Sequence, residues 1–158
     1  MITVISGGQT GVDQAALRAA RACGLATGGY APRGWYTEDG LAPWLADYGL
    51  VECVRFGYPA RTERNVATAD AVLWVGDMTS PGGRLTLRLS RSRGLLESCY
   101  SSPAAVMPLM VAEWLRLAVP DGGRLLVAGN RESTSPGIGA AAERVLIEVF
   151  TLAKERLA

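Results

Sequence analysis

Short apolar runs alternate with helix-length stretches along the chain, and this alternation is the strongest constraint on its fold. The clearest runs are Thr3–Ile5, Ala71–Val75 and Leu125–Ala128, and a glycine-containing turn follows each of them. We expect strands at these positions, and Ala71–Val75 has the composition of a strand buried on both faces. Strands that alternate with helices predict an α/β fold, with a doubly wound, mainly parallel sheet and helices on both faces.

Weaker patterns place the remaining elements. Arg84, Arg88 and Arg91 recur at helical spacing, which predicts a solvated face on the helix after the turn Gly76–Gly83. The segment Ala31–Pro43 has no periodicity and indicates a long, ordered functional loop. The other expected helices are Val12–Cys23, Arg61–Asp70, Pro103–Leu117 with Ser102 as its cap, and Ile138–Leu157, and the other expected strands are Leu25–Tyr30, Val51–Val54 and Leu95–Tyr100.

Length and charge bound the classes of function. A chain of 158 residues predicts one domain, residues 1–158. Its 16 Lys and Arg residues nearly balance 15 Asp and Glu residues, so neither nucleic acid nor an acidic membrane is an expected partner. No apolar stretch approaches about 18 residues, and we expect a cytoplasmic protein. Cys23, Cys53 and Cys99 form no CxxC pair and are expected to be reduced thiols.

Histidine is absent from the chain. Its absence excludes Ser-His-Asp and Cys-His pairs, HExxH metal sites and imidazole acid–base catalysis. Chemistry here has to use carboxylates, arginines, hydroxyls, thiols or backbone amides. Because Lys154 is the only lysine, arginine supplies almost all of the positive charge, and guanidinium groups suit the recognition of phosphate and other oxyanions.

Four loops that follow predicted strands carry the candidate ligand contacts. In a parallel α/β sheet, ligands bind outside the carboxyl ends of the strands, so these loops should converge. The first loop places glycines before a helix whose amides can face an anion, but it is neither GxGxxG nor GxxxxGK[ST]. The candidates are Gly7, Gly8, Gln9, Thr10 and Gly11 in the first loop, Arg33 in the second, Gly82 and Gly83 in the third, and Arg131 and Ser133 in the fourth.

Each loop also has a purely structural interpretation. The glycines can serve as connectors, and the polar residues of the fourth loop can simply face solvent. Asp13 would repel a bound anion unless it faces a cation or a donor, so we expect it in a supporting role. Arg61 and Asn65 precede the central strand and can either turn towards the crevice or lie on the surface.

Several of these segments share a pattern with one known family. The most specific is Ile5–Leu17, which reads ISGGQTGVDQAAL. The others are Gly28–Gly34 with Glu38–Gly40, Arg61–Val66 with Ala69-Asp70 before a strand, and Gly129–Ser133 with Pro136–Ile138. Together they resemble the molybdenum carrier, or molybdenum cofactor carrier, proteins, and the resemblance extends along nearly the whole chain.

The resemblance implies a Rossmann-like fold, related to the LOG phosphoribohydrolases, and a homo-oligomer. It also implies that the loops bind a small anionic ligand, either the molybdenum cofactor (molybdopterin) or molybdate, without a catalytic residue. A molybdoenzyme that receives the cofactor is then an expected partner. Three segments depart from the family pattern: Ser80–Arg84 reads SPGGR in place of Ser-Gly-Gly-Thr, Asn130 replaces a proline, and Leu95–Tyr100 is a poor match to the family's Gly-Lys-Pro strand entry.

Two alternatives remain open. Pro81–Gly83 is similar to a turn of the LOG-type nucleotide phosphoribohydrolases, but residues 84–88 lack the second glycine and the downstream carboxylate of that family. Glu38 and Asp39 would be the acid–base candidates of such an enzyme. The second alternative is a nucleotide-binding sensor without turnover.

Overall fold

Six parallel strands form the central sheet of a computed structural model that describes residues 1–155. Their order is β5-β2-β1-β8-β6-β7, which confirms the α/β, Rossmann-like prediction. Ile5 pairs with Leu126, and Val75 pairs with Gly129, so β1, β8 and β6 end side by side at one edge of the sheet. The strands are β1 (Thr3–Ile5), β2 (Ala26–Ala31), β5 (Leu50–Glu52), β6 (Ala71–Val75), β7 (Leu96–Tyr100) and β8 (Arg124–Gly129).

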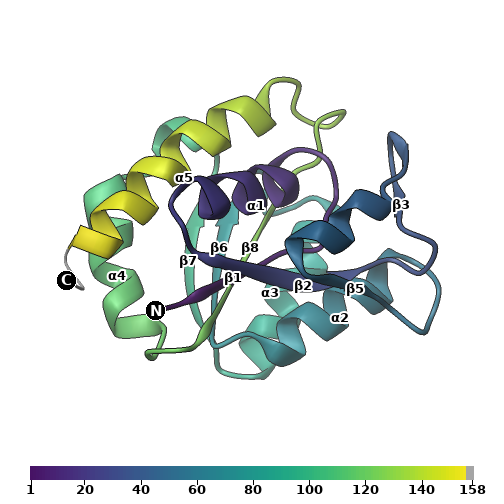
Figure 1. The fold of residues 1–158 in the computed structure, drawn as a ribbon, viewed down its shortest axis with the longest axis horizontal. Helices are drawn as coiled ribbons and strands as arrows, with labels where there is room; N and C mark the ends of the chain where they lie inside the picture. Colours follow the sequence, from purple (N-terminus) through teal and green to yellow (C-terminus); the bar gives the residue numbers. More distant parts are fainter. Residues whose placement is uncertain (156–158) are drawn as a thin grey trace.

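Helices cover both faces of the sheet (Figure 1). On one face lie α1 (Val12–Ala22), α4 (Pro108–Ala118) and α5 (Ile138–Glu155), and on the other lie α2 (Tyr58–Thr68) and α3 (Pro81–Ser92).

Alternation along the strands feeds two cores. Val4, Leu73 and Leu125 pack towards α1, α4 and α5, while their neighbours, such as Val72 and Leu126, pack towards α2 and α3. All five residues of β6 are buried, as predicted for a strand covered on both faces.

The predicted loop Ala31–Pro43 contains a small hairpin. Its strands are β3 (Tyr36–Thr37) and β4 (Gly40–Leu41), which pair antiparallel, and the 3-10 helix η1 (Pro43–Tyr48) follows. Beneath them a third small core forms, made of Leu17, Ala31, Ala42, Leu45 and Leu50. The segment is therefore anchored to the sheet rather than extending into solvent.

The prediction of one helix over Pro103–Leu117, capped by Ser102, is wrong. A short 3-10 helix, η2 (Pro103–Ala105), comes first, and α4 begins only at Pro108. Proline has no N–H to donate and forces the preceding residue into extended backbone, so a helix can start at Pro108 but not run through it. Met107 accordingly has φ −104° and ψ 98°.

Two helix boundaries also differ from the prediction. The helix predicted over Arg61–Asp70 is α2, which begins at Tyr58 and ends at Thr68. The helix predicted from Ile138 begins there, and the structure describes it as far as Glu155, so the predicted residues 156–157 lie outside the described chain.

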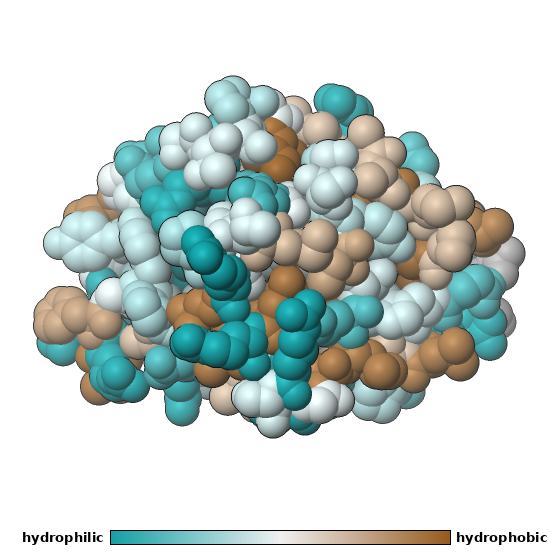
Figure 2. Space-filling model, turned by 180° about the vertical axis from the view of Figure 1, so that it is seen from behind, coloured by the Kyte–Doolittle hydropathy of each residue, from teal (hydrophilic) through white to brown (hydrophobic). Residues whose placement is uncertain are grey.

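The arginine face of α3 is solvated, as predicted. Arg84, Arg88 and Arg91 are all exposed, while Gly83, Thr86, Leu87 and Ser90 face the protein. On the rear of the molecule, strongly hydrophilic side chains extend across hydrophobic surface (Figure 2). Long arginine stems cover apolar surface in this way while their charged ends remain in water. Cys23, Cys53 and Cys99 are free thiols, and none of the helices within residues 1–155 offers an apolar length sufficient to cross a bilayer.

Candidate functional site

A cleft of about 360 Å³ lies at the carboxyl edge of the sheet, on the side of α2 and α3. Parallel α/β sheets bind their ligands at this edge, and three of the four predicted loops contribute to it. The residues that line it are Gly7, Gln9, Asp13, Arg61, Thr62, Asn65, Trp74, Ser80, Pro81, Gly82, Thr86, Leu126, Ala128, Gly129, Asn130, Arg131, Ser133 and Thr134.

Five of the predicted site residues meet in this cleft. Gly7 and Gln9 come from the β1–α1 loop, Gly82 from the first turn of α3, and Arg131 and Ser133 from the β8–α5 loop. Gly82 has open space around it, with no atom within 4 Å of the position that a Cβ would take. The absence of a side chain there leaves room for a ligand beside the N-terminus of α3.

Other predicted glycines support the site from behind. Gly8 has φ +75°, and a Cβ there would lie 2.6 Å from Leu45. At Gly11, with φ +78°, a Cβ would overlap the main chain of Asn130, and at Gly83 it would lie 2.8 Å from a main-chain oxygen. Glycine is needed at these positions for close packing of the loops, and none of the three lines the cleft.

The structure places Arg33 outside the cleft. Its Nη1 donates to the main-chain oxygen of Val54 at 3.1 Å, and its guanidinium lies 4.3 Å from the ring centre of Phe56. The second loop therefore does not bring its arginine to the other three. It approaches them instead through Glu38, whose main-chain N–H donates to Gln9 Oε1 at 3.0 Å.

Asp13 fills the position that the glycine turn offers to an anion. Its Oδ2 accepts from the N–H of Gln9 at 3.3 Å and from Arg61 Nη1 at 3.0 Å. Burial raises the pKa of Asp13, while Arg61 and the N–H groups of Gln9, Gly129 and Gly7 act to lower it. Because this carboxylate occupies the turn, a ligand anion has to bind elsewhere in the cleft.

The first amides of α1 are also engaged within the chain. Val12 N–H donates to the oxygen of Asn130 at 3.2 Å, and Gln14 N–H donates to the oxygen of Gln9 at 3.2 Å. These two N–H groups are therefore not available to a ligand, in contrast to the expectation for the amides that enter this helix.

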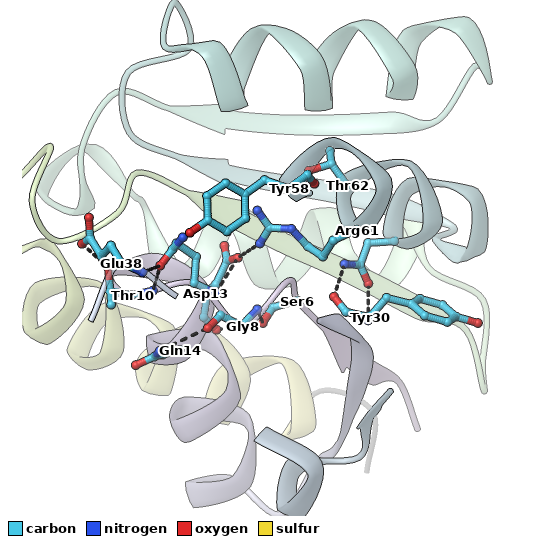
Figure 3. A network of polar contacts seen from close by, with 12 residues as sticks. Ser6, Gly8, Thr10, Asp13, Gln14, Tyr30, Glu38, Tyr58, Arg61 and Thr62 are labelled. Carbon is cyan, nitrogen blue, oxygen red and sulfur yellow. Dashed lines mark hydrogen bonds and ion pairs between the residues drawn. The ribbon is translucent and has the colours of Figure 1, made fainter. Parts of the chain in front are cut away.

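The Arg61 side chain packs against the first loop and lies beside Asp13 (Figure 3). Gly7 makes this possible, since a Cβ there would overlap the Arg61 side chain. Only 12% of the Arg61 side chain is exposed, and its Nε is buried without a hydrogen-bond partner within residues 1–155. The centre of the Tyr58 ring is 5.6 Å from the Arg61 guanidinium and 5.4 Å from that of Arg131.

Gln9 presents a fixed donor to the cleft. Its Oε1 accepts from two main-chain N–H groups, those of Thr10 and Glu38, each at 3.0 Å. Because both partners are donors, this atom is the oxygen, and the amide orientation is thereby settled. Gln9 is only 6% exposed, and its Nε2 atom is buried without a hydrogen-bond partner in the described chain. Buried donors are almost always satisfied, so Gln9 points to a ligand acceptor.

Two buried asparagines hold the walls of the cleft. Asn65 donates to the oxygen and accepts from the N–H of Tyr30, both at 2.9 Å, and so joins α2 to β2. Asn130 Oδ1 accepts from Asp77 N–H at 2.6 Å and its Nδ2 donates to Ser80 at 3.3 Å. The residue that departs from the family pattern therefore ties the third and fourth loops together.

The sequence prediction missed the apolar floor. Trp74, Leu126 and Ala128 belong to β6 and β8 and line the cleft between its polar walls. They were expected only as buried strand residues. The signal that could have identified them is position: Trp74 and Ala128 pair with each other near the carboxyl ends of adjacent strands. Within residues 1–155 there is no group of three or more Cys, Asp or Glu side chains suited to a metal ion.

Comparison with known proteins gives a family and one structural relative. The model of the circularly permuted YpsA SLOG family matches residues 4–150. A crystal structure of a "putative molybdenum carrier protein" from Syntrophus aciditrophicus is 30% identical, with a TM-score of 0.77, and the match covers 94% of this chain and 93% of that one. No curated protein matches the chain.

The strand order agrees with a circular permutation. Starting the count at β8 and continuing through α5 to β1 numbers the sheet 4-3-2-1-5-6, which is a regular doubly wound order that grows outward from one strand. The last described turn of α5 also lies near the first residue, because Met1 and Lys154 line the same surface cavity. A short connection between these two regions, together with a chain break before β8, would give the unpermuted order.

Proposed function

Since the chain belongs to the circularly permuted YpsA SLOG family, we propose that it is a carrier that binds and protects a small anionic ligand in the cleft, with the molybdenum cofactor or molybdate as its cargo. The observation that carries the proposal is the fixed amide of Gln9, whose buried Nε2 lacks an acceptor within residues 1–155. The relative's name, a molybdenum carrier, supports the choice of cargo.

The charge and shape of the cleft support a ligand with one anionic group and a flat ring. Two cations, Arg61 and Arg131, outweigh the single lining carboxylate, Asp13. The volume is at the lower end of the range for small-molecule sites. Ala128 and the small exposed parts of Trp74 and Leu126, which are each only 2% exposed, provide the apolar surface of the cleft.

The donors fit the chemistry of the molybdenum cofactor. Gln9 and Arg61 would bind oxygen acceptors, and Arg131 with the N-terminus of α3 at Gly82 would hold a phosphate. The pterin ring would lie against the small apolar surface at Ala128. The cofactor supplies its own redox chemistry in the enzyme that receives it, and this chain would only bind it and exclude water.

A nucleotide is the second candidate ligand. Pro81 and Gly82 open α3 inside the cleft, where a nucleotide phosphate would bind by the same chemistry. Hydrolysis of such a ligand is less well supported, because the carboxylate that lines the cleft, Asp13, already accepts hydrogen bonds from the main chain and from Arg61. The expected acid–base candidates of such an enzyme, Glu38 and Asp39, do not line the cleft.

Titration calorimetry tests the proposal. Freshly released molybdenum cofactor and AMP are each titrated into the wild type and into Gln9→Glu, in anaerobic, phosphate-free buffer. The variant keeps the shape and the accepting oxygen but replaces the donor with an anion, so affinity should fall at least about tenfold. Gln14→Glu is the matched control, because it adds the same charge at a residue that does not line the cleft. Equal losses in both variants, or no binding to the wild type, would contradict the proposal.

A further inference from the structure

Glu38 links three loops around the cleft. It lies in the turn between β3 and β4, and its carboxylate accepts from the hydroxyls of Thr10 and Ser133. The N–H of Ser133 also donates to Glu38 Oε1 at 3.0 Å. One side chain of the hairpin thus holds the β1–α1 loop and the β8–α5 loop together.

The main chain of the same residue orients Gln9. Glu38 N–H is one of the two donors that fix Gln9 Oε1, and Thr10 N–H is the other. Thr10 Oγ1 in turn accepts from the N–H of Glu132, next to Arg131. These hydrogen bonds connect the Glu38 carboxylate with the Gln9 amide, and Figure 3 shows Glu38 beside Thr10.

We propose that Glu38 is a positioning residue, which sets ligand affinity by holding the Gln9 amide and the Arg131 loop in their binding arrangement. This inference rests on the proposed function of the cleft. Glu38 does not line the cleft and does not touch the ligand itself. Its carboxylate keeps the hairpin in place, and the hairpin keeps the Glu38 N–H on Gln9.

The electrostatic surroundings favour the charged carboxylate that this role requires. Burial acts to raise the pKa of Glu38, but hydrogen bonds from Ser133 and Thr10 outweigh it, and Arg131 adds to them, so the pKa is lowered from its usual 4.5. Asp39, the next residue, is exposed, and within residues 1–155 its one hydrogen bond is donated by its main-chain N–H to Thr37 Oγ1. Asp39 is therefore a matched control on the same turn.

The experiment uses nitrogen-15 NMR on the full chain, first without ligand. The sequence has two glutamines and two asparagines, at positions 9, 14, 65 and 130, so the four side-chain amide pairs are readily assigned. In Glu38→Ala the Gln9 pair should shift or broaden, while the Gln14 pair stays in place. Glu38→Gln, which keeps the shape and one accepting oxygen, should give a smaller change, and Asp39→Ala none. An unchanged Gln9 pair in Glu38→Ala would overturn the inference.

A second measurement separates positioning from a general loss of structure. Glu38→Ala should weaken molybdenum cofactor binding about five- to tenfold, the equivalent of one hydrogen bond. In a Gln9→Ala background the further loss should be clearly smaller than in the wild type, because part of the effect of Glu38 acts through Gln9. Additive losses would overturn the proposed coupling. If the wild type binds neither molybdenum cofactor nor AMP, the proposed function fails, and the ligand-free spectra still decide the role of Glu38.

Discussion

Replacing Arg61 with methionine would remove the cation beside a buried carboxylate while keeping most of the apolar stem. Arg61 and Asp13 are 3.0 Å apart, with side chains that are 12% and 6% exposed. Removing one member of such a buried pair costs about 3–5 kcal/mol. Asp13 keeps its main-chain donors, so we expect the lower end, about 3 kcal/mol. For a chain of this size that corresponds to a melting temperature lower by roughly 6–12 °C.

The pH dependence of the loss identifies its cause. Burial already raises the pKa of Asp13, and loss of Arg61 removes the largest opposing influence, so its pKa should rise further. A carboxyl group whose pKa is higher in the folded than in the unfolded chain costs stability as pH rises between the two values. The deficit of Arg61→Met should therefore be larger at about pH 8 than at about pH 5.

Thermal unfolding is monitored by circular dichroism at both pH values, and Arg55→Met is the control. Arg55 pairs with Glu63 at 3.2 Å, but the two side chains are 77% and 43% exposed. Exposed pairs contribute about 0–1 kcal/mol, so this control should melt close to the wild type. Equal shifts in the two variants, or a shift in Arg61→Met that does not change with pH, would refute the argument.

Three further predictions concern residues in and around the cleft. Asn65→Ala leaves the main-chain N–H and oxygen of Tyr30 without their 2.9 Å partners, and urea unfolding should show a loss of about 2 kcal/mol; a loss below about 0.5 kcal/mol would mean that water replaces the amide. Gly82→Ala should unfold like the wild type but bind the cofactor more weakly. Gly83→Ala should lose stability, because a main-chain oxygen lies 2.8 Å from the new Cβ. If both variants changed stability and binding in the same way, the separate roles of the two glycines would be contradicted. The stability that the Glu38 carboxylate contributes is present above its ordinary pKa of 4.5 and is lost as pH falls through its lower folded pKa. The free energy of unfolding of Glu38→Gln should therefore fall less steeply than that of the wild type between about pH 5 and pH 3.

The strands and the edge that carries the cleft could be predicted because they depend on local patterns. The buried run Ala71–Val75 and the glycine turn after Ile5 are visible in the sequence, and parallel pairing then brings their ends together. The start of α4 differs from the prediction because Pro108 begins the helix, although the helical pattern extends back to Pro103. The effect of proline on a helix is also local, so the sequence was sufficient to place this boundary.

The roles of individual site residues depend on contacts between distant segments, which spacing does not reveal. Asp13 was expected only to support the site, yet it occupies the anion position of the turn because Arg61, 48 residues away, lies beside it. Arg33 looked like a ligand contact, but its guanidinium rests on Phe56 instead. The apolar floor at Trp74 could not be told from ordinary core without knowing which strand ends form the cleft.

The most direct test of the account follows the Gln9 side-chain amide by nitrogen-15 NMR while molybdenum cofactor is added to the wild-type chain. Because the Gln9 Nε2 is a buried donor without an acceptor within residues 1–155, we predict that its resonance pair shifts progressively as the cofactor is added. The pair of Gln14, whose Nε2 already donates to the oxygen of Gly8 at 3.1 Å, should hardly move. Ligand binding that leaves the Gln9 pair unshifted, or no binding of the cofactor at all, would contradict the claim that this cleft holds the cargo.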